Sequence, residues 1–194
     1  MRKQIAKLVS IVFSPFVIGL GLILLASLET TASISEAFRW SLILIILSIL
    51  PILFFTIFLV RKKRLDGILA SARKQRTIIY GLTIVLAIIT STILITLKAP
   101  LTLIALSVIS LTTSIVFMCV NLRWKISLHT AFIGGAVVVL FILYGVRSIV
   151  SIVVLPLVAW ARMELKQHSP AQVIIGPFAA ASIMVVMFYL FGLI

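Results

Sequence analysis

Long apolar stretches separated by short polar segments make up almost the whole chain. Most of them are about twenty residues long, which is the length that an α-helix needs to cross the hydrocarbon core of a bilayer. Inside lipid the backbone must satisfy its own hydrogen bonds, and helices do so within one segment. The pattern therefore predicts an all-α, polytopic transmembrane helix bundle with about six to seven spans, because the sixth stretch is short for a full crossing. The predicted spans are Leu8–Leu28, Phe38–Val60, Ile78–Leu97, Leu101–Val120, Leu128–Val146, Ser148–Ala161 and Gln172–Ile194.

No polar region is long enough for a separate soluble domain, so residues 1–194 are predicted to form a single integral membrane domain. Residues 1–36 would be an N-terminal anchor span with its loop, and residues 37–194 the helical core. The first apolar run is longer than the hydrophobic region of a cleaved signal peptide. It therefore predicts an uncleaved anchor.

Prolines and small residues mark expected helix ends and helix contacts. Pro100 predicts a tight hairpin between the third and fourth spans. Ser169-Pro170 predicts the N-cap and first residue of the last helix. Pro177 predicts a kink in that helix. The small residues Gly134-Gly135 and Gly176 predict close helix packing.

The composition agrees with a membrane protein, since 63% of the residues are hydrophobic and 11% are charged. The net charge is +13, from 17 Lys and Arg against 4 Asp and Glu. In a soluble protein this excess would indicate nucleic-acid binding. Here the basic residues lie between apolar stretches, which fits anionic lipid headgroups instead, and no nucleic-acid partner is expected.

The basic residues also predict an orientation. If each of the seven stretches crosses once, fourteen of the 17 Lys and Arg lie on one side, and only Arg39, Lys98 and Arg147 lie on the other. The positive-inside rule places the fourteen in the cytoplasm. We therefore expect a multi-pass protein of the cell membrane whose basic face is cytoplasmic.

Two short polar segments carry the two histidines of the chain. One is Lys125-Ile-Ser127-Leu-His129, and the other runs from Arg162 to His168. An ionisable side chain is costly to place in lipid and so indicates function. Histidine is well suited to proton transfer and nucleophilic attack near neutral pH. Both segments and the basic loop after the second span fall on the same predicted face, which indicates phosphate chemistry at a membrane surface.

These segments resemble the type 2 phosphatidic acid phosphatase superfamily, whose motifs are Lys-x6-Arg-Pro, Pro-Ser-Gly-His and Ser-Arg-x5-His-x3-Asp. Residues 126–129 keep the Ser and His of the second motif. Arg162 and His168 keep the spacing of the third, and Arg73–Arg76 stand where the first would fall. The resemblance covers the chain from about residue 61 to residue 172.

The resemblance implies a lipid phosphatase that needs no metal and no cofactor. His168 would attack phosphorus and form a phospho-histidine, and His129 would protonate the leaving oxygen. Gln172, one helical turn after His168, would orient its ring. The substrate would be a prenyl phosphate or a phosphatidic acid, taken from among the membrane lipids. The phosphate-binding residues would be Arg162, Ser127, Lys125, Arg76 and Arg73.

The chain departs from the family motifs at several positions. Leu69 or Asp66, depending on the register, stands in place of the first lysine. Ala161 replaces the serine of the third motif, and Gln172 replaces its aspartate. A catalytically decayed lipid-phosphate binding or assembly protein is therefore the alternative, and either histidine could be structural. A third alternative is a small transporter or channel component, which would need polar groups within the spans. The spans carry no charge in their middle parts and mainly hydroxyl residues, so this alternative is the least favoured. The residues are Thr90, Ser91, Thr112, Thr113 and Ser114.

Overall fold

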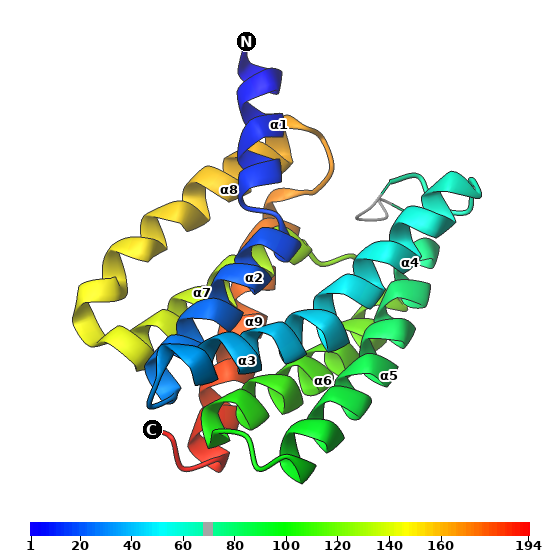
Figure 1. Ribbon diagram of the computed structural model, residues 1–194. Coiled ribbons are helices and arrows are strands. Elements are labelled where there is room, and N and C mark those ends of the chain that lie inside the picture. Colours follow the sequence, from blue (N-terminus) through cyan, green and yellow to red (C-terminus); the bar gives the residue numbers. More distant parts are fainter. Residues whose placement is uncertain (68–71) are drawn as a thin grey trace. The chain divides into compact units, whose positions relative to one another are not determined.

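The computed structural model describes residues 1–67 and 72–194, and every regular element in these ranges is a helix (Figure 1). The elements are α1 (Arg2–Val12), α2 (Pro15–Thr30), α3 (Ile34–Leu44), η1 (Ile45–Ile49), α4 (Leu50–Arg61), α5 (Arg73–Thr96), α6 (Leu101–Asn121), α7 (Leu128–Tyr144), η2 (Gly145–Val153), α8 (Val154–Glu164) and α9 (Pro170–Leu190).

Six helical stretches of the described residues are long and apolar enough to cross a membrane. They are Arg2–Thr30, Ile34–Arg61, Arg73–Thr96, Leu101–Asn121, Leu128–Glu164 and Pro170–Leu190. The predicted all-α, multi-span architecture is confirmed. Leu69, at which one register of the first motif would place its lysine, lies outside the described residues.

The helices form two compact units. The terminal unit consists of residues 1–22 and 126–194, and the central unit of residues 23–125, so the boundary falls within α2. Each unit has its own packing. The single domain expected from the sequence stays a prediction.

The first predicted span is interrupted after α1. Pro15 begins α2, and because proline lacks an N–H and disfavours helical backbone at the residue before it, the chain favours a break at this point. Ser14 caps the new helix, since its Oγ accepts a hydrogen bond from the Val17 N–H at 3.4 Å. The apolar pattern gives the length of this span but does not show that it is divided.

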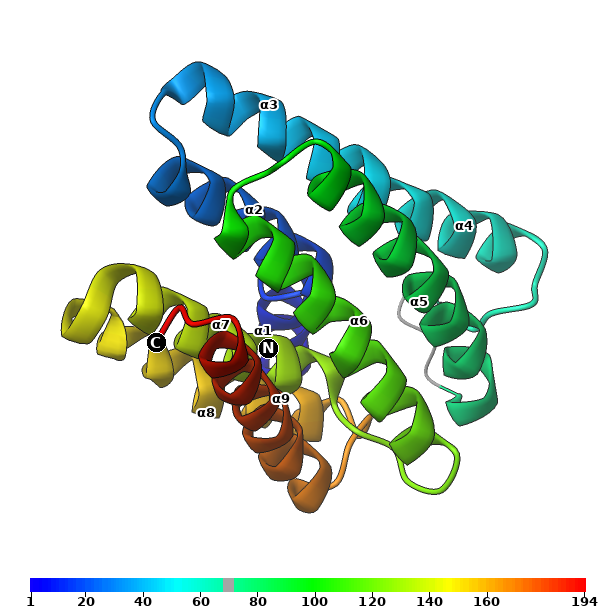
Figure 2. The same cartoon turned by 90° about the horizontal axis from the view of Figure 1, so that it is seen from below.

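The central unit contains α3 to α6, which lie side by side as elongated helices (Figure 2). α5 and α6 pack along each other and are joined by a tight turn. In this turn Lys98 has φ 54°, Ala99 N–H donates to the Leu94 carbonyl at 2.9 Å, and Pro100 is the N-cap of α6. The hairpin predicted at Pro100 is confirmed.

A π-helical turn, η1, joins α3 to α4 in the middle of the second long helix. Leu50 N–H donates to the carbonyl of Ile45, five residues earlier. Pro51 has no N–H for the carbonyl of Leu47, so the regular α-helical ladder cannot continue through this turn. Such π turns are rare and are found frequently at functional sites.

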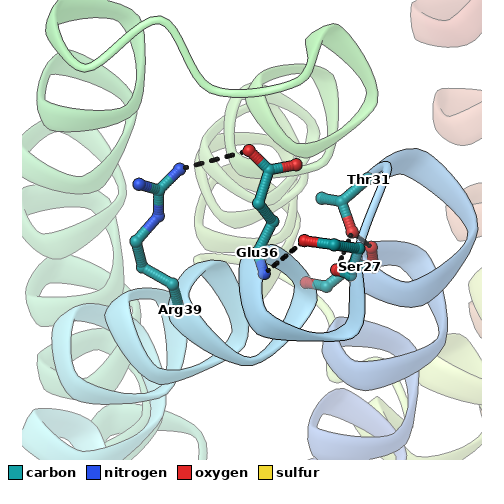
Figure 3. A network of polar contacts seen from close by, with 5 residues as sticks. Ser27, Thr31, Glu36 and Arg39 are labelled. Atoms are coloured by element: carbon teal, nitrogen blue, oxygen red, sulfur yellow. Dashed lines mark hydrogen bonds and ion pairs between the residues drawn. The ribbon is translucent and has the colours of Figure 1, made fainter.

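Short polar side chains hold the turn between α2 and α3 (Figure 3). Thr31 Oγ1 donates to the Ser27 carbonyl at 2.8 Å. Ser33 is the N-cap of α3, and its Oγ accepts from the Glu36 N–H at 3.2 Å. Arg39 lies 3.9 Å from the Glu36 carboxylate in an exposed pair. Helix capping by Ser33 and local contacts within the turn account for these polar residues.

In the terminal unit α7 and α9 pack closely through glycine. A Cβ added to Gly134 would lie 2.5 Å from the Cα of Pro177, so only glycine fits there. A Cβ on Gly176 would lie 3.0 Å from the Ser127 carbonyl oxygen. The close approach predicted from these small residues is confirmed. Pro177 lies inside α9, which continues as one helix through it.

The apolar stretch Leu128–Glu164 reverses its direction. α7 ends at Tyr144, and Gly145 has φ 65°, which glycine adopts without a steric penalty. The 3₁₀-helix η2 and α8 then run back along α7, and α1 packs against α8 (Figure 1). The expected division between the fifth and sixth spans agrees with this break.

Candidate functional site

The polar residues of the second and third segments lie at helix ends of the terminal unit. Ser127 is the N-cap of α7, and His129 lies in its first turn. Arg162 lies in the last turn of α8, and His168 precedes the N-cap of α9. Between α8 and α9 the backbone turns at Lys166, which has φ 55°. This short connection keeps Arg162 and His168 near one another in the fold.

The start of α9 is fixed by a capping box between Ser169 and Gln172. Gln172 N–H donates to Ser169 Oγ at 3.4 Å, and Ser169 N–H donates to Gln172 Oε1 at 3.3 Å. Pro170 follows the cap, where its missing N–H has no intrahelical partner to lose. The predicted N-cap is confirmed. That Gln172 takes part in this capping box was not predicted from the sequence.

His168 is held by the same amide oxygen, because its Nδ1 lies 3.0 Å from Gln172 Oε1. The Ser169 N–H can only donate, so the Gln172 amide atom that faces it must be the oxygen and not the nitrogen. The same oxygen faces His168 Nδ1. His168 Nδ1 is therefore the donor. In the neutral imidazole this tautomer leaves the lone pair on Nε2. The His168 side chain is buried, with 8% of its surface exposed.

Arg162 is buried beside this loop, with 6% of its surface exposed. Its guanidinium donates to Oε1 of Gln167, the residue before His168, and Gln167 N–H donates to the Arg162 carbonyl at 3.1 Å. A guanidinium stays charged and offers donors in a planar fork that matches phosphate oxygens. Gln167 was not singled out from the sequence, although its position between Arg162 and His168 is the signal that could have done so.

Ser127 joins the start of α7 to the first turn of α9. Its N–H donates to the Gln172 carbonyl at 3.4 Å, and its side chain is fully buried. In the part of the chain that the structure describes, Ser127 Oγ is a buried hydroxyl without a hydrogen-bond partner. A hydroxyl in this state is costly unless it bonds to a further group. It is therefore available to donate to a ligand oxygen.

His129 contacts α1. Its Nε2 lies 3.2 Å from the carbonyl oxygen of Ser10, and since a carbonyl only accepts, Nε2 carries the proton. His129 is buried, with 2% of its surface exposed. The contribution of Ser10 was not predicted, because nothing in the apolar run from Leu8 shows which residue of α7 it meets.

Arg73, Arg76 and Lys125 belong to the central unit, and their distances from the histidines are not fixed. Arg73 guanidinium donates to the carbonyl of Arg123 at 2.7 Å, just beyond the C-terminus of α6. Asn121 Nδ2 donates to the Arg73 carbonyl at 2.9 Å. Arg76 is buried in the first turn of α5. The convergence of all three polar segments on one anion stays a prediction.

What the terminal unit does bring together is an imidazole with a fixed tautomer, a buried guanidinium and a buried hydroxyl. These groups lie at adjoining helix ends and match the needs of phosphate binding. Searches of the chain against family models, curated proteins and solved structures found no match.

Proposed function

We propose that this chain is a membrane-embedded phosphatase that hydrolyses a lipid phosphate or diphosphate through a phospho-histidine at His168. The observation that carries the proposal is the hydrogen bond from His168 Nδ1 to Gln172 Oε1 at 3.0 Å. It orients the ring and, in the neutral imidazole, places the proton on Nδ1 and the lone pair on Nε2, the nitrogen proposed to attack. The motif resemblance around Arg162 and His168 supports the same role.

The proposed reaction has two steps. His168 Nε2 attacks phosphorus, the N–P bond forms, and the bond from phosphorus to the lipid oxygen breaks. The lipid oxygen takes a proton and leaves as an alcohol, or as a lipid phosphate when the substrate is a diphosphate. A water molecule then attacks phosphorus and passes a proton to His129, which the first step left deprotonated; the N–P bond breaks, and inorganic phosphate leaves. Splitting hydrolysis in this way replaces one difficult step by two easier ones.

Charge develops on the phosphoryl oxygens in both steps, and fixed donors stabilise it. Arg162 supplies a guanidinium, and Ser127 Oγ supplies a hydroxyl proton. Lys125, Arg73 and Arg76 would complete the phosphate-binding set if the two units bring them to the same place. These phosphate-binding residues would contact the phosphate oxygens both in the bound substrate and in the transition state. Their loss should therefore weaken binding as well as turnover.

His129 is the proposed acid for the leaving oxygen. Its Nε2 proton is bonded to the Ser10 carbonyl, so donation to substrate requires that bond to be exchanged for one to the lipid oxygen. Apo geometry does not rule out such an acid, since catalytic hydrogen bonds often form only in the complex.

A specific observation favours a second candidate function, a lipid-phosphate binding or assembly protein without turnover. The residue that orients His168 is an amide and brings no negative charge to stabilise the imidazolium. In a serine protease triad, an amide in place of the orienting carboxylate costs about 10⁴ in kcat. Arg162 and Ser127 would bind phosphate whether or not His168 reacts.

The test is phosphate release by the full chain reconstituted in vesicles that contain a prenyl diphosphate, a prenyl phosphate or phosphatidic acid. His168→Asn should abolish release, because it removes the nucleophile. The matched control is Arg147→Gln, which should leave release unchanged. Arg147 is an exposed basic residue in η2, just after the end of α7 that lies away from His129. If wild type and His168→Asn behave alike on every lipid, the phosphatase proposal is wrong.

Binding of a phosphate analogue such as vanadate separates the two functions. Ser127→Ala removes a donor to a charged ligand and should weaken binding roughly 10- to 100-fold. Ser10→Ala is the control and should leave binding unchanged. Ser10 Oγ is also a buried hydroxyl without a partner among the described residues. His129 contacts the Ser10 carbonyl and not its side chain, so the substitution keeps that contact. Specific binding without turnover would favour the binding protein. Equal binding by both variants would contradict a role of Ser127.

A further inference from the structure

The backbone ends α8 with a Schellman motif, the commonest kind of helix C-terminus that uses a left-handed residue. Gln167 N–H donates to the Arg162 carbonyl at 3.1 Å, and Lys166 N–H donates to the Met163 carbonyl at 2.8 Å. Lys166 has φ 55°, in the left-handed region. These two bonds and this conformation define the motif. Main-chain groups therefore end the helix, and the side chains of Arg162 and Gln167 are not needed for that purpose.

Three other helices of the described residues end with the same pair of backbone bonds, and each has a buried apolar residue at the position that Arg162 occupies in α8. These residues are Leu59 in α4, Leu94 in α5 and Phe188 in α9. An apolar contact at this position frequently accompanies the motif. In α8 the same position holds a guanidinium, and it is buried.

The guanidinium of Arg162 has a polar partner within the motif. It donates to Oε1 of Gln167, the residue whose N–H closes the motif. A charged group bonded to a neutral acceptor thus stands where the other three helices have an apolar residue. Burying a charge is costly even when it is hydrogen-bonded, so stability alone does not favour this exchange. The exchange indicates a function for the guanidinium.

The chemistry of the acceptor suits anion binding. A guanidinium carries five N–H donors in one plane, and a bond at one corner fixes the direction of that plane. A carboxylate at position 167 would also fix it, but would place a negative charge beside the site and repel phosphate oxygens. The amide oxygen of Gln167 holds Arg162 and leaves its positive charge uncompensated.

We propose that Gln167 is a positioning residue for phosphate binding, which holds the Arg162 guanidinium in one orientation without neutralising it. This inference rests on the proposed function, in which Arg162 binds the phosphate. It gives opposite requirements to the two glutamines that flank His168. A negative charge at Gln172 would assist the imidazolium, whereas a negative charge at Gln167 would weaken phosphate binding.

The experiment measures the Kd of orthovanadate for the full chain in detergent by isothermal titration calorimetry. Gln167→Met keeps the length of the side chain and removes the acceptor, so the Kd should rise roughly tenfold. Gln167→Glu keeps the acceptor and adds a negative charge, and the Kd should rise by at least as much. Arg147→Gln is the matched control, because it lowers the net charge by the same amount at an exposed residue of η2 and should leave the Kd unchanged.

A double-mutant cycle shows whether Gln167 acts through Arg162. In an Arg162→Met background, Gln167→Met should cause no further rise in Kd. This double variant has an apolar residue at the position where α4, α5 and α9 have one, so it should fold, and its thermal midpoint checks this. A merely structural role of Gln167 would raise the Kd equally in both backgrounds.

Two failures can be told apart. If Arg162→Met weakens vanadate binding but either Gln167 variant binds as tightly as the wild type, or if the effects in the cycle are additive, the role of Gln167 is wrong and the phosphate site stands. If Arg162→Met leaves the Kd unchanged, the proposed phosphate site is wrong, and the role of Gln167 is wrong with it.

Discussion

At the scale of single residues, Gln172 has two roles in the geometry. Its Oε1 accepts from the Ser169 N–H, which starts α9, and from His168 Nδ1, which orients the proposed nucleophile. From the sequence, Gln172 was expected to orient the ring. Its Oε1 lies 3.0 Å from His168 Nδ1, and the catalytic role of this contact stays a prediction. The amide reaches the imidazole as a carboxylate would, but it leaves the developing imidazolium without a counter-charge.

We therefore predict that Gln172→Glu increases turnover at least tenfold. Glutamate has the same reach as glutamine, suits the same position of a capping box, and adds the negative charge. Gln172→Ala should lower turnover by a similar factor, because the ring is no longer held. The measurement is kcat for phosphate release at fixed pH, with the thermal midpoint of each variant as the control for folding. Equal rates for Glu, Gln and Ala would limit this residue to helix capping.

At the scale of helices, the pair α7 and α9 positions the candidate site. Gly134 contacts Pro177, and Gly176 contacts the Ser127 carbonyl, so the helix start that carries Ser127 and His129 is pressed against the first turns of α9. Membrane helices gain stability from such close packing between small residues. The distance between Ser127 and Gln172 depends on it.

We expect Gly134→Ala to destabilise the protein by about 1–3 kcal/mol, because the new Cβ would lie 2.5 Å from the Pro177 Cα and the helices must separate. Gly21→Ala in α2 is the control. Nothing lies within 4 Å of a Cβ at Gly21, so alanine there should be neutral or stabilising by up to about 1 kcal/mol. The free energy of unfolding in detergent checks both. Equal effects of the two substitutions would show that the α7–α9 contact is not tight.

The helices themselves were predictable, whereas their partners were not. Spans follow from hydropathy because lipid leaves the backbone few other choices, and the Ser169 cap and the Pro100 hairpin follow from local chemistry. The break before Pro15 was missed because the apolar run continues across it. The contact from His129 to Ser10 joins residues 119 positions apart, and no periodicity encodes such a pairing.

At the scale of the whole molecule, the course of Leu128–Glu164 decides on which side of the membrane each loop lies. A straight α-helix of these 37 residues would be about 55 Å long, far more than the hydrocarbon thickness of about 30 Å. η2 and α8 instead return along α7 from Gly145, and together they are about 34 Å long. Two crossings therefore fit this stretch, and we predict that the chain crosses seven times.

Seven crossings give a testable map of the loops. In a Cys119→Ser background, single cysteines at Lys98 and Arg147 should react with an impermeant maleimide added to intact cells. Cysteines at Lys62 and Lys166 should react only after lysis, because the basic face is predicted to be cytoplasmic. Labelling is measured by the mass shift of the protein. Protection of Arg147→Cys in both conditions would mean that the stretch crosses once, and labelling of Lys166→Cys from outside would reverse the proposed side of the site.

The bond from His129 to α1 has a practical consequence for mutagenesis. Its acceptor is a main-chain oxygen, which every amino acid at position 10 supplies equally. A small substitution such as Ser10→Ala would leave this oxygen in place and hide the connection. Only deletion of the segment, or a proline that displaces its backbone, would expose how much the imidazole depends on it.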